Sequence, residues 1–378
     1  MPINVFVPKF HTDEILEHMR ECLDRGWTGL GFKTIDFENA WKDYTGLPNA
    51  HYMCSNTVGL HLALNVLKKK HGWKDGDEVI STPLTFVSTN HAILYEHLKP
   101  VFADVDEYLC LDPVDIEEKI TERTRAVMFV GMGGNSGRLT EVAELCSQKG
   151  LVLVLDAAHM AGTRLNGKHV GSEGEVAIFS FQAVKNLPTG DSGMVCFMDE
   201  ELDKQARKLS WMGISKDTYQ RFNTQKGSYR WRYDVPELGF KYHGNSIMAS
   251  IGIVQLKYVD EDNAYRRKLA AQYDDLLAEV PQVEIVPTAP NCETSRHLYQ
   301  ICVPQRDEVM QHFYENDIYP GVHYVENTEY PMYAYGAGTC ARAAEYASRL
   351  ISLPLHLRVT TEDVEKVVSV LRSFSFYR

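Results

Sequence analysis

The stretch AIFSFQAVKNLPTGDSG, residues 177–193, begins as an apolar run and breaks into a polar, glycine-containing loop with Lys185 at the break. Upstream, the apolar run LVLVL, residues 151–155, stops at Asp156. Short apolar runs bounded by polar segments are typical of buried strands in a parallel sheet. Chemistry in open α/β sheets gathers at the carboxyl ends of the strands. The sequence therefore predicts that Asp156 and Lys185 lie at one edge of such a sheet.

An acid and a lysine placed in this way suit pyridoxal 5′-phosphate, which needs a Schiff base and a protonated ring nitrogen. Each signal also has an ordinary structural explanation, because a strand-end Asp commonly caps a helix and a single Lys is usually a solvated charge. Lys185, however, follows a run too apolar for a surface and is bracketed by Ser180, Thr189 and Ser192. This context favours the functional interpretation.

The composition narrows the class of protein. A chain of 378 residues fits a large domain plus a smaller one, which we expect at 1–250 and 251–378. The net charge of −12 argues against nucleic acid and anionic membrane surfaces as partners. No apolar stretch approaches the ~20 residues that a membrane span needs, and the start of the chain lacks a signal-peptide pattern. The eight cysteines are scattered without a C-x-x-C pair, so we expect a cytoplasmic protein with reduced cysteines and no metal site.

Apolar strand-like runs at 51–54, 78–86, 100–105 and 126–130 alternate with helical patterns, which indicates βαβ units and a mainly parallel sheet. Residues 246–278 are predicted to form one or two long helices. The chain from 283 onward has short strands, including 297–303, and a last amphipathic helix at about 361–374, as in an α+β domain.

Three segments need separate interpretation. The glycines at 131–137 do not match the spacing of a dinucleotide-binding fingerprint, so we expect a flexible loop after a strand. Residues 200–237 are polar and aromatic, which suggests an active-site lid or a dimer arm. Residues 55–57, Ser-Asn-Thr, stand between a strand and a helix, where they suit either a phosphate site or a helix cap.

Several motifs in order resemble one family, the pyridoxal-phosphate sugar aminotransferases of fold type I (DegT/DnrJ/EryC1/StrS type). The motifs cover nearly the whole chain and are, in order, 28–31, 55–57 followed by LHLAL, 82–86, 100–106, 155–159, 180–187, 239–242, 321–324 and 352–356. The resemblance implies an α/β fold with a mostly parallel seven-stranded sheet in the large domain and a smaller α+β C-terminal domain.

The resemblance also assigns roles to residues of this chain. Lys185 would carry the cofactor and then move a proton between two carbon atoms, and Asp156 would pair with the ring nitrogen. The other implied cofactor contacts are Phe86 on the ring face, Asn56, Thr57 and Ser180 at the phosphate, and His159 or Gln182 near the ring hydroxyl. Lys241 is implied to reach the cofactor phosphate of the neighbouring subunit, and the substrate contacts are Thr28, Leu30, His323 and Tyr324.

The chain departs from the family pattern at several positions. Asn56 stands where glycine is frequent, His159 where glutamine is frequent, and Lys241 where asparagine is common. The loop 131–137 lacks the histidine of its usual version. Lys241 could meet a phosphate as a point charge or could point to substrate.

The expected activity is transfer of an amino group from an amino acid, by resemblance glutamate, to a keto-sugar, by resemblance a nucleotide-linked keto-deoxysugar. A free keto-sugar acid remains an alternative substrate. A sugar dehydratase of the same fold is another alternative, but it would need the lysine replaced, often by histidine, so Lys185 argues against it. A catalytically silent regulator of this fold is a third alternative, and the presence of both Lys185 and Asp156 argues against it. We expect a homodimer with composite active sites, in which the six Lys and Arg residues of 211–242 meet anionic groups; a solvated surface arm is the competing interpretation.

Overall fold

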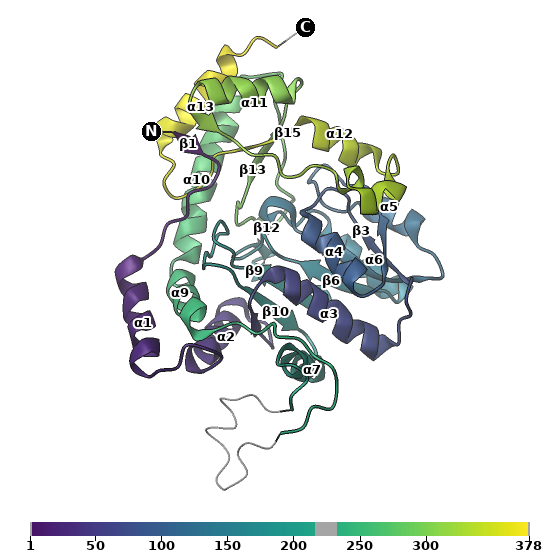
Figure 1. Ribbon diagram of the computed structural model, residues 1–378. Coiled ribbons are helices and arrows are strands. Elements are labelled where there is room, and N and C mark those ends of the chain that lie inside the picture. Colours follow the sequence, from purple (N-terminus) through teal and green to yellow (C-terminus); the bar gives the residue numbers. More distant parts are fainter. Residues whose placement is uncertain (1, 216–232, 377–378) are drawn as a thin grey trace.

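A sheet of seven strands organises the computed structural model, which describes residues 2–215 and 233–376 (Figure 1). Its order is β2 (His51–Met53), β10 (Gly193–Phe197), β9 (Val176–Ser180), β6 (Val152–Asp156), β5 (Thr124–Val130), β3 (Glu78–Ser81) and β4 (Lys99–Phe102). The strands from β9 to β4 are parallel, and β10 is antiparallel to both of its neighbours. The predicted mostly parallel seven-stranded sheet is confirmed.

The central strands are apolar at every position because both faces of the sheet are covered. Successive side chains of a strand point to opposite faces, so Phe129 and Leu155 enter one core while Met128 and Val154 enter the other. The first core is closed by α2 (Phe32–Thr45), α5 (Pro113–Lys119) and α6 (Leu139–Lys149). The second is closed by α3 (Asn56–His71), α4 (Val87–Tyr95) and α7 (Glu200–Ser210).

Helix α7 corrects part of the interpretation of residues 200–237 as a lid or dimer arm. Its side chains Leu202, Ala206 and Leu209 recur at helical spacing and are buried against the second core. The Asp199 side chain accepts a hydrogen bond from the Glu201 N–H at 2.8 Å and caps the helix. The polar residues of 200–210 are therefore the solvent face of a helix, and the prediction for the rest of the segment is not tested, since residues 216–232 lie outside the described part of the chain.

The C-terminal part has the expected α+β character. A three-stranded antiparallel sheet, β11 (Glu284–Ile285), β13 (Tyr299–Cys302) and β15 (Leu350–Leu353), shares a core with α10 (Val259–Leu277), α11 (Arg306–Glu315) and α13 (Thr361–Ser373). The last helix is confirmed at the expected place, whereas the sequence reasoning missed α12 (Ala341–Arg349) and β15. The boundary at 250/251 stays a prediction; α9 (Ser246–Leu256) runs across it.

Two small sheets and three 3₁₀ helices complete the described structure. Near the N-terminus, β1 (Ile3–Asn4) pairs in parallel with β14 (Ile318–Tyr319) and lies beside the C-terminal helices, before α1 (Thr12–Asp24) (Figure 1). A small sheet joins β7 (Arg164–Leu165) with β8 (Lys168–His169) and β12 (Cys292–Glu293). Short 3₁₀ helices are η1 (Met132–Gly134), η2 (Asn327–Glu329) and η3 (Pro331–Gly336). Among the helices of residues 2–215 and 233–376, none combines the length and apolarity needed to cross a bilayer.

The start of α3 lies very close to the sheet edge, and Gly193 makes this approach possible. A Cβ atom at Gly193 would lie 2.8 Å from the backbone nitrogen of Asn56 and 2.8 Å from the carbonyl oxygen of Phe179. Both atoms belong to the backbone, so no side chain can move aside. Glycine at this position therefore fixes where the N-terminus of α3 stands relative to β9 and β10.

We expect Gly193→Ala to lower the free energy of unfolding by about 1–3 kcal/mol, because the added methyl group must displace backbone at a packed contact. Urea denaturation of the ligand-free protein measures the effect. Gly29→Ala is the matched control, since a Cβ there meets nothing within 4 Å. Equal denaturation midpoints for the two variants would contradict the steric role of Gly193.

Candidate active site

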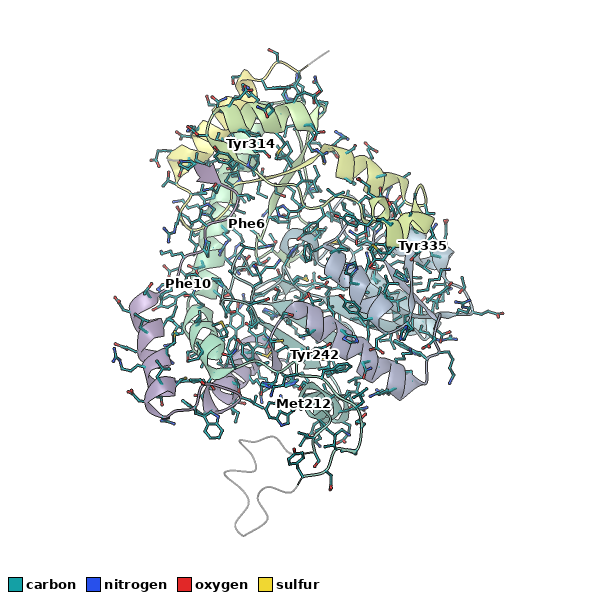
Figure 2. All side chains as sticks on the ribbon, in the orientation of Figure 1. Phe6, Phe10, Met212, Tyr242, Tyr314 and Tyr335 are labelled. Atoms are coloured by element: carbon teal, nitrogen blue, oxygen red, sulfur yellow. The ribbon has the colours of Figure 1, made fainter. Side chains whose placement is uncertain are left out.

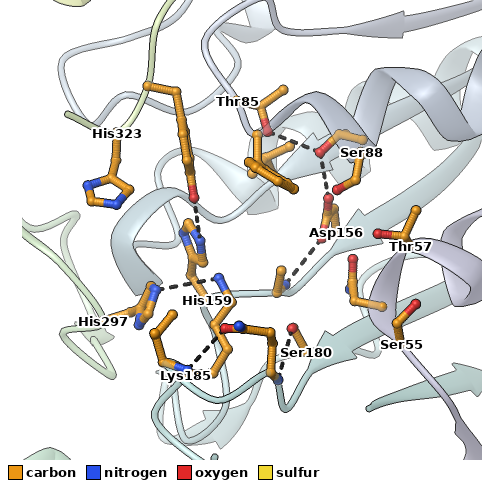
Figure 3. Close-up of a pocket in the computed structure, with 18 of the residues that line it drawn as sticks. Ser55, Thr57, Thr85, Ser88, Asp156, His159, Ser180, Lys185, His297 and His323 are labelled. Atoms are coloured by element: carbon orange, nitrogen blue, oxygen red, sulfur yellow. Dashed lines mark hydrogen bonds between the residues drawn. The ribbon is translucent and has the colours of Figure 1, made fainter. Parts of the chain in front are cut away.

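A cavity of about 400 Å³ opens at the carboxyl edge of the sheet (Figure 3). Ten of the residues expected at a site line this cavity together: Asn56, Thr57, Phe86, Asp156, His159, Ser180, Gln182, Lys185, His323 and Tyr324. The strands β6 and β9 deliver Asp156 and Ser180 at their last positions. The prediction that the acid and the lysine meet at one edge of the sheet is confirmed.

Lys185 is held by a turn that follows β9. Its backbone N–H donates to the carbonyl of Gln182 at 2.8 Å, and the Gln182 side-chain oxygen accepts from Val184 N at 3.0 Å. Burial lowers the pKa of the Lys185 amine to about 8, against the opposing effect of the Asp156 charge. An amine with this pKa can both take up and release a proton near neutral pH.

Asp156 is a buried carboxylate with neutral partners. Its Oδ2 accepts from the Thr89 hydroxyl at 2.8 Å, and its Oδ1 accepts from the Ala158 N–H at 3.2 Å. The Thr85 hydroxyl lies 3.0 Å from that of Thr89 and extends the chain of hydroxyls. Burial raises the pKa of Asp156 despite these bonds and despite the nearby charge of Lys185. A cationic N–H placed in the cavity would offset this burial and restore the ionised form.

The N-terminus of α3 faces the same cavity through residues 55–57. Ser55 caps the helix by accepting from Val58 N at 3.4 Å. The Asn56 amide donates to the carbonyl of Ile178 at 3.2 Å, and a hydrogen bond from the same side chain lowers the pKa of Asp156. The Thr57 side chain and the backbone N–H groups that the first turn of a helix cannot pair internally are available to an anion in the cavity.

His159 is fixed by the glycine loop that follows β5. The Gly133 N–H donates to His159 Nδ1 at 3.2 Å, so Nε2 carries the ring proton. His159 Nε2 lies 3.2 Å from the hydroxyl oxygen of Tyr324 and donates to it. Burial lowers the pKa of His159 well below its usual value, which keeps the ring neutral. The Tyr324 hydroxyl proton is then left for another acceptor.

Aromatic side chains form the mouth of the cavity. Phe86 is 56% exposed on the rim, and its ring centroid lies 5.8 Å from that of Tyr324. From the N-terminal segment, Phe6 reaches inward (Figure 2) and stacks on His297 with ring centroids 5.4 Å apart. Both ends of the chain therefore contribute to the wall.

Three expected site residues do not line this cavity. Thr28 and Leu30 line a separate hollow that also contains Trp211. Lys241 is exposed, and its Nζ lies 3.2 Å from the centroid of the Trp211 ring. These residues come together beside the end of α7, where Figure 2 places Met212 and Tyr242. Within one chain they form a second cluster that lies outside the cavity.

The sequence reasoning missed several residues of the cavity. Thr85 stands out only as part of the motif 82–86, and Thr89 carries no signal, because a threonine in the first turn of a helix is ordinary. His297 begins a strand-like run in the sequence. Only the fold shows that it lines the cavity beside Lys185, because it lies in the loop before β13.

These residues fit pyridoxal 5′-phosphate. The hydrogen bonds that the buried Asp156 carboxylate accepts from Thr89 and Ala158 come from neutral donors, and a ring N–H would supply a cationic one. The amine of Lys185 titrates near neutrality, and the helix end suits the phosphate. In the part of the chain that the structure describes, no three His, Cys, Asp or Glu side chains are grouped so as to hold a metal ion.

Comparison with known proteins identifies the family of the chain. The DegT/DnrJ/EryC1/StrS aminotransferase family model matches residues 10–372. The dTDP-4-dehydro-2,3,6-trideoxy-D-glucose 4-aminotransferase of Saccharopolyspora spinosa is 34% identical over 97% of this chain and 94% of its own. The spore coat polysaccharide biosynthesis protein SpsC of Bacillus subtilis is 34% identical over 95% of this chain and 94% of its own. The crystal structure of the aminotransferase TlmJ from Streptoalloteichus hindustanus, 32% identical, superimposes with a TM-score of 0.89 over 99% of this chain and 98% of that one. The chain belongs to the DegT/DnrJ/EryC1/StrS aminotransferase family, and it is a transaminase of fold type I.

Proposed function

We propose that this transaminase uses pyridoxal 5′-phosphate to move an amino group from an amino acid, glutamate, to a nucleotide-linked keto-deoxysugar in amino-sugar or surface-polysaccharide synthesis. The observation that carries the proposal is the shared cavity of Lys185 and Asp156 at the end of a helix suited to phosphate. The sugar substrate is supported by the Saccharopolyspora spinosa relative, whose name specifies a dTDP-linked keto-deoxysugar. The eight cysteines, all unpaired, support a place in the cytoplasm.

The bound cofactor would supply a carbonyl that captures amines and a ring that withdraws electrons from the neighbouring carbon. Asp156 would hold the proton on the ring nitrogen, because a buried carboxylate favours a cationic partner. The backbone N–H groups at the start of α3, with Ser180 and Thr57, would hold the phosphate. Phe86 would cover the ring from the rim. The Tyr324 hydroxyl, with its proton directed away from His159, can donate to an oxygen of the cofactor or the sugar.

Lys185 would act as the base and acid that moves a proton between two carbon atoms. When its amine is not bonded to the cofactor, Lys185 would be available to do so. A pKa of about 8 leaves a substantial fraction of the amine neutral at physiological pH, while its protonated form remains a usable acid.

We further propose a homodimer with composite sites. The proposal is supported by the cluster of Thr28, Leu30, Trp211 and Lys241, which resembles site residues of the family yet stands outside this chain's own cavity. A second copy could bring the exposed Lys241 to the cofactor phosphate, and Thr28 and Leu30 to the sugar.

Borohydride reduction of the protein with pyridoxal phosphate should place the pyridoxyl group on Lys185, since this amine is neutral at a lower pH than a surface lysine. Peptide mapping by mass spectrometry identifies the labelled residue. Lys185→Ala should remove both the label and the transfer of amino groups from glutamate to keto-sugars. A label on another lysine would overturn the assignment.

Asp156→Asn should keep the fold, because the change is nearly isosteric, while turnover falls about 10²–10³-fold with the loss of one preorganised charge. Asp43→Asn, on the exposed face of α2, is the matched control and should keep wild-type turnover. Single-turnover kinetics with glutamate measure both. Near-wild-type rates in Asp156→Asn would mean that another group keeps the ring protonated.

Mixing Lys185→Ala subunits with Lys241→Ala subunits tests the composite site. A mixed dimer collects both lesions in one site and leaves the other intact, so a 1:1 mixture should recover about a quarter of wild-type activity. Each variant mixed with itself is the control, and differently tagged subunits show that exchange has occurred. No recovery after confirmed exchange would show that each chain builds its site alone.

A further inference from the structure

A buried chain of hydrogen bonds connects Lys185 to α10 through three side chains. Asn186 directly follows Lys185, Asn263 comes from α10, and His297 comes from the loop before β13; all three are buried. His297 Nε2 lies 3.5 Å from Lys185 Nζ on the cavity wall (Figure 3). His297 is 112 residues from Lys185 in the sequence, so only the fold brings the two side chains together.

Two backbone carbonyls fix the orientation of both amides. Asn263 Nδ2 donates to the carbonyl of Ala161 at 3.0 Å, and Asn186 Nδ2 donates to the carbonyl of Ser295 at 2.7 Å. Because a carbonyl can only accept, the amide NH₂ must be the group that faces it. The second bond of Asn186 Nδ2, to Asn263 Oδ1 at 2.7 Å, agrees with both orientations.

The orientation of Asn186 decides the proton position on His297. Asn186 Oδ1 lies 2.9 Å from His297 Nδ1, and an amide oxygen can only accept. Nδ1 must therefore carry the ring proton, and Nε2 presents a lone pair to the amine of Lys185. Burial, with the nearby positive charges of Lys185 and Arg266, lowers the pKa of His297 well below its usual value, so the ring stays neutral.

We propose that His297 is a further catalytic residue, a hydrogen-bond acceptor of fixed tautomer for the Lys185 amine, and that Asn186 is the positioning residue that sets this tautomer. The acceptor favours the ammonium form, since a charged donor makes the stronger bond. It thereby limits how far burial lowers the basicity of the lysine. The use of this hydrogen bond in moving a proton rests on the proposed function. The tautomer of His297 and the basicity of the Lys185 amine do not.

Other groups face Lys185 from the neighbouring elements. They are Asp156 at the end of β6, His159 after it, and His323 and Tyr324 after β14. Asp156 raises the pKa of Lys185. His323 bonds Ser352 Oγ at 2.9 Å through Nδ1, and burial lowers its pKa to about 4, so it is neutral as well. His323 is therefore a neutral histidine of the same cavity, like His297, but its hydrogen bond is to Ser352 rather than to Lys185. This makes a variant of His323 the matched control for a variant of His297.

The first measurement is the tautomer of His297 in wild-type protein without cofactor or substrate. Nuclear magnetic resonance of ¹⁵N-histidine-labelled protein distinguishes protonated from unprotonated ring nitrogens, and His297→Gln identifies the signal. We expect a protonated Nδ1 and an unprotonated Nε2 at neutral pH, and a loss of this preference in Asn186→Ala. A protonated Nε2 in the wild type would overturn the proposal.

The second measurement is the pKa of Lys185, obtained from the pH dependence of trace acetylation with acetic anhydride and peptide mapping. His297→Leu should lower this pKa by about 1, the size of a hydrogen bond to a charged group. His297→Gln, whose amide oxygen can accept, should restore part of the difference, and His323→Leu should change the pKa much less. Equal values for His297→Leu and His323→Leu would overturn the proposal, and if His297→Leu does not fold, the wild-type tautomer decides. Neither measurement uses substrate or turnover, so a wrong substrate assignment would leave both results unchanged.

Discussion

The burial of one carboxylate, Asp156, at the end of a fully covered strand is the constraint on which the rest of the site depends. The sheet must be apolar on both faces to hold seven strands between two helical layers, and this same covering removes water from the strand ends. A charge in that place is costly unless a partner compensates for it. Thr89 and Ala158 compensate only in part, which is why the cavity favours a ligand with a cationic N–H.

The two neutral histidines of the cavity show how backbone placement controls side-chain chemistry. A backbone N–H of Gly133 sets one tautomer on His159, and an amide oxygen of Asn186 sets the opposite tautomer on His297. The Gly133 carbonyl also accepts from the His297 N–H at 3.0 Å, so one short loop after β5 holds both histidines. The glycine-containing loop at 131–137, which does not match a dinucleotide-binding fingerprint, thus supports the catalytic wall.

The sequence predicts the features that depend on a local pattern, such as strands and strand ends. It does not predict side-chain contacts between residues that are far apart in the chain. Apolar runs that end in Asp156 and before Lys185 suffice to predict a parallel sheet and its reactive edge, because strand ends share that edge by topology. Helix α7 was missed because its buried stripe of Leu202, Ala206 and Leu209 is diluted by charges on its exposed face. His297 could not be assigned, since its partner Asn186 lies on another element. The role of Lys241 depends on a second copy and stays a prediction.

The pairing of Ile3 with Ile318 has a consequence for biosynthesis. During translation the large sheet can form from consecutive βαβ units, whereas β1 must wait until β14 has left the ribosome. The contact between Phe6 and His297 faces a similar delay, because His297 is synthesised long after Phe6. The nascent protein can therefore hold a nearly complete sheet while one wall of its cavity is still missing, and stable capture of the cofactor is expected only after the segment through β14 has emerged.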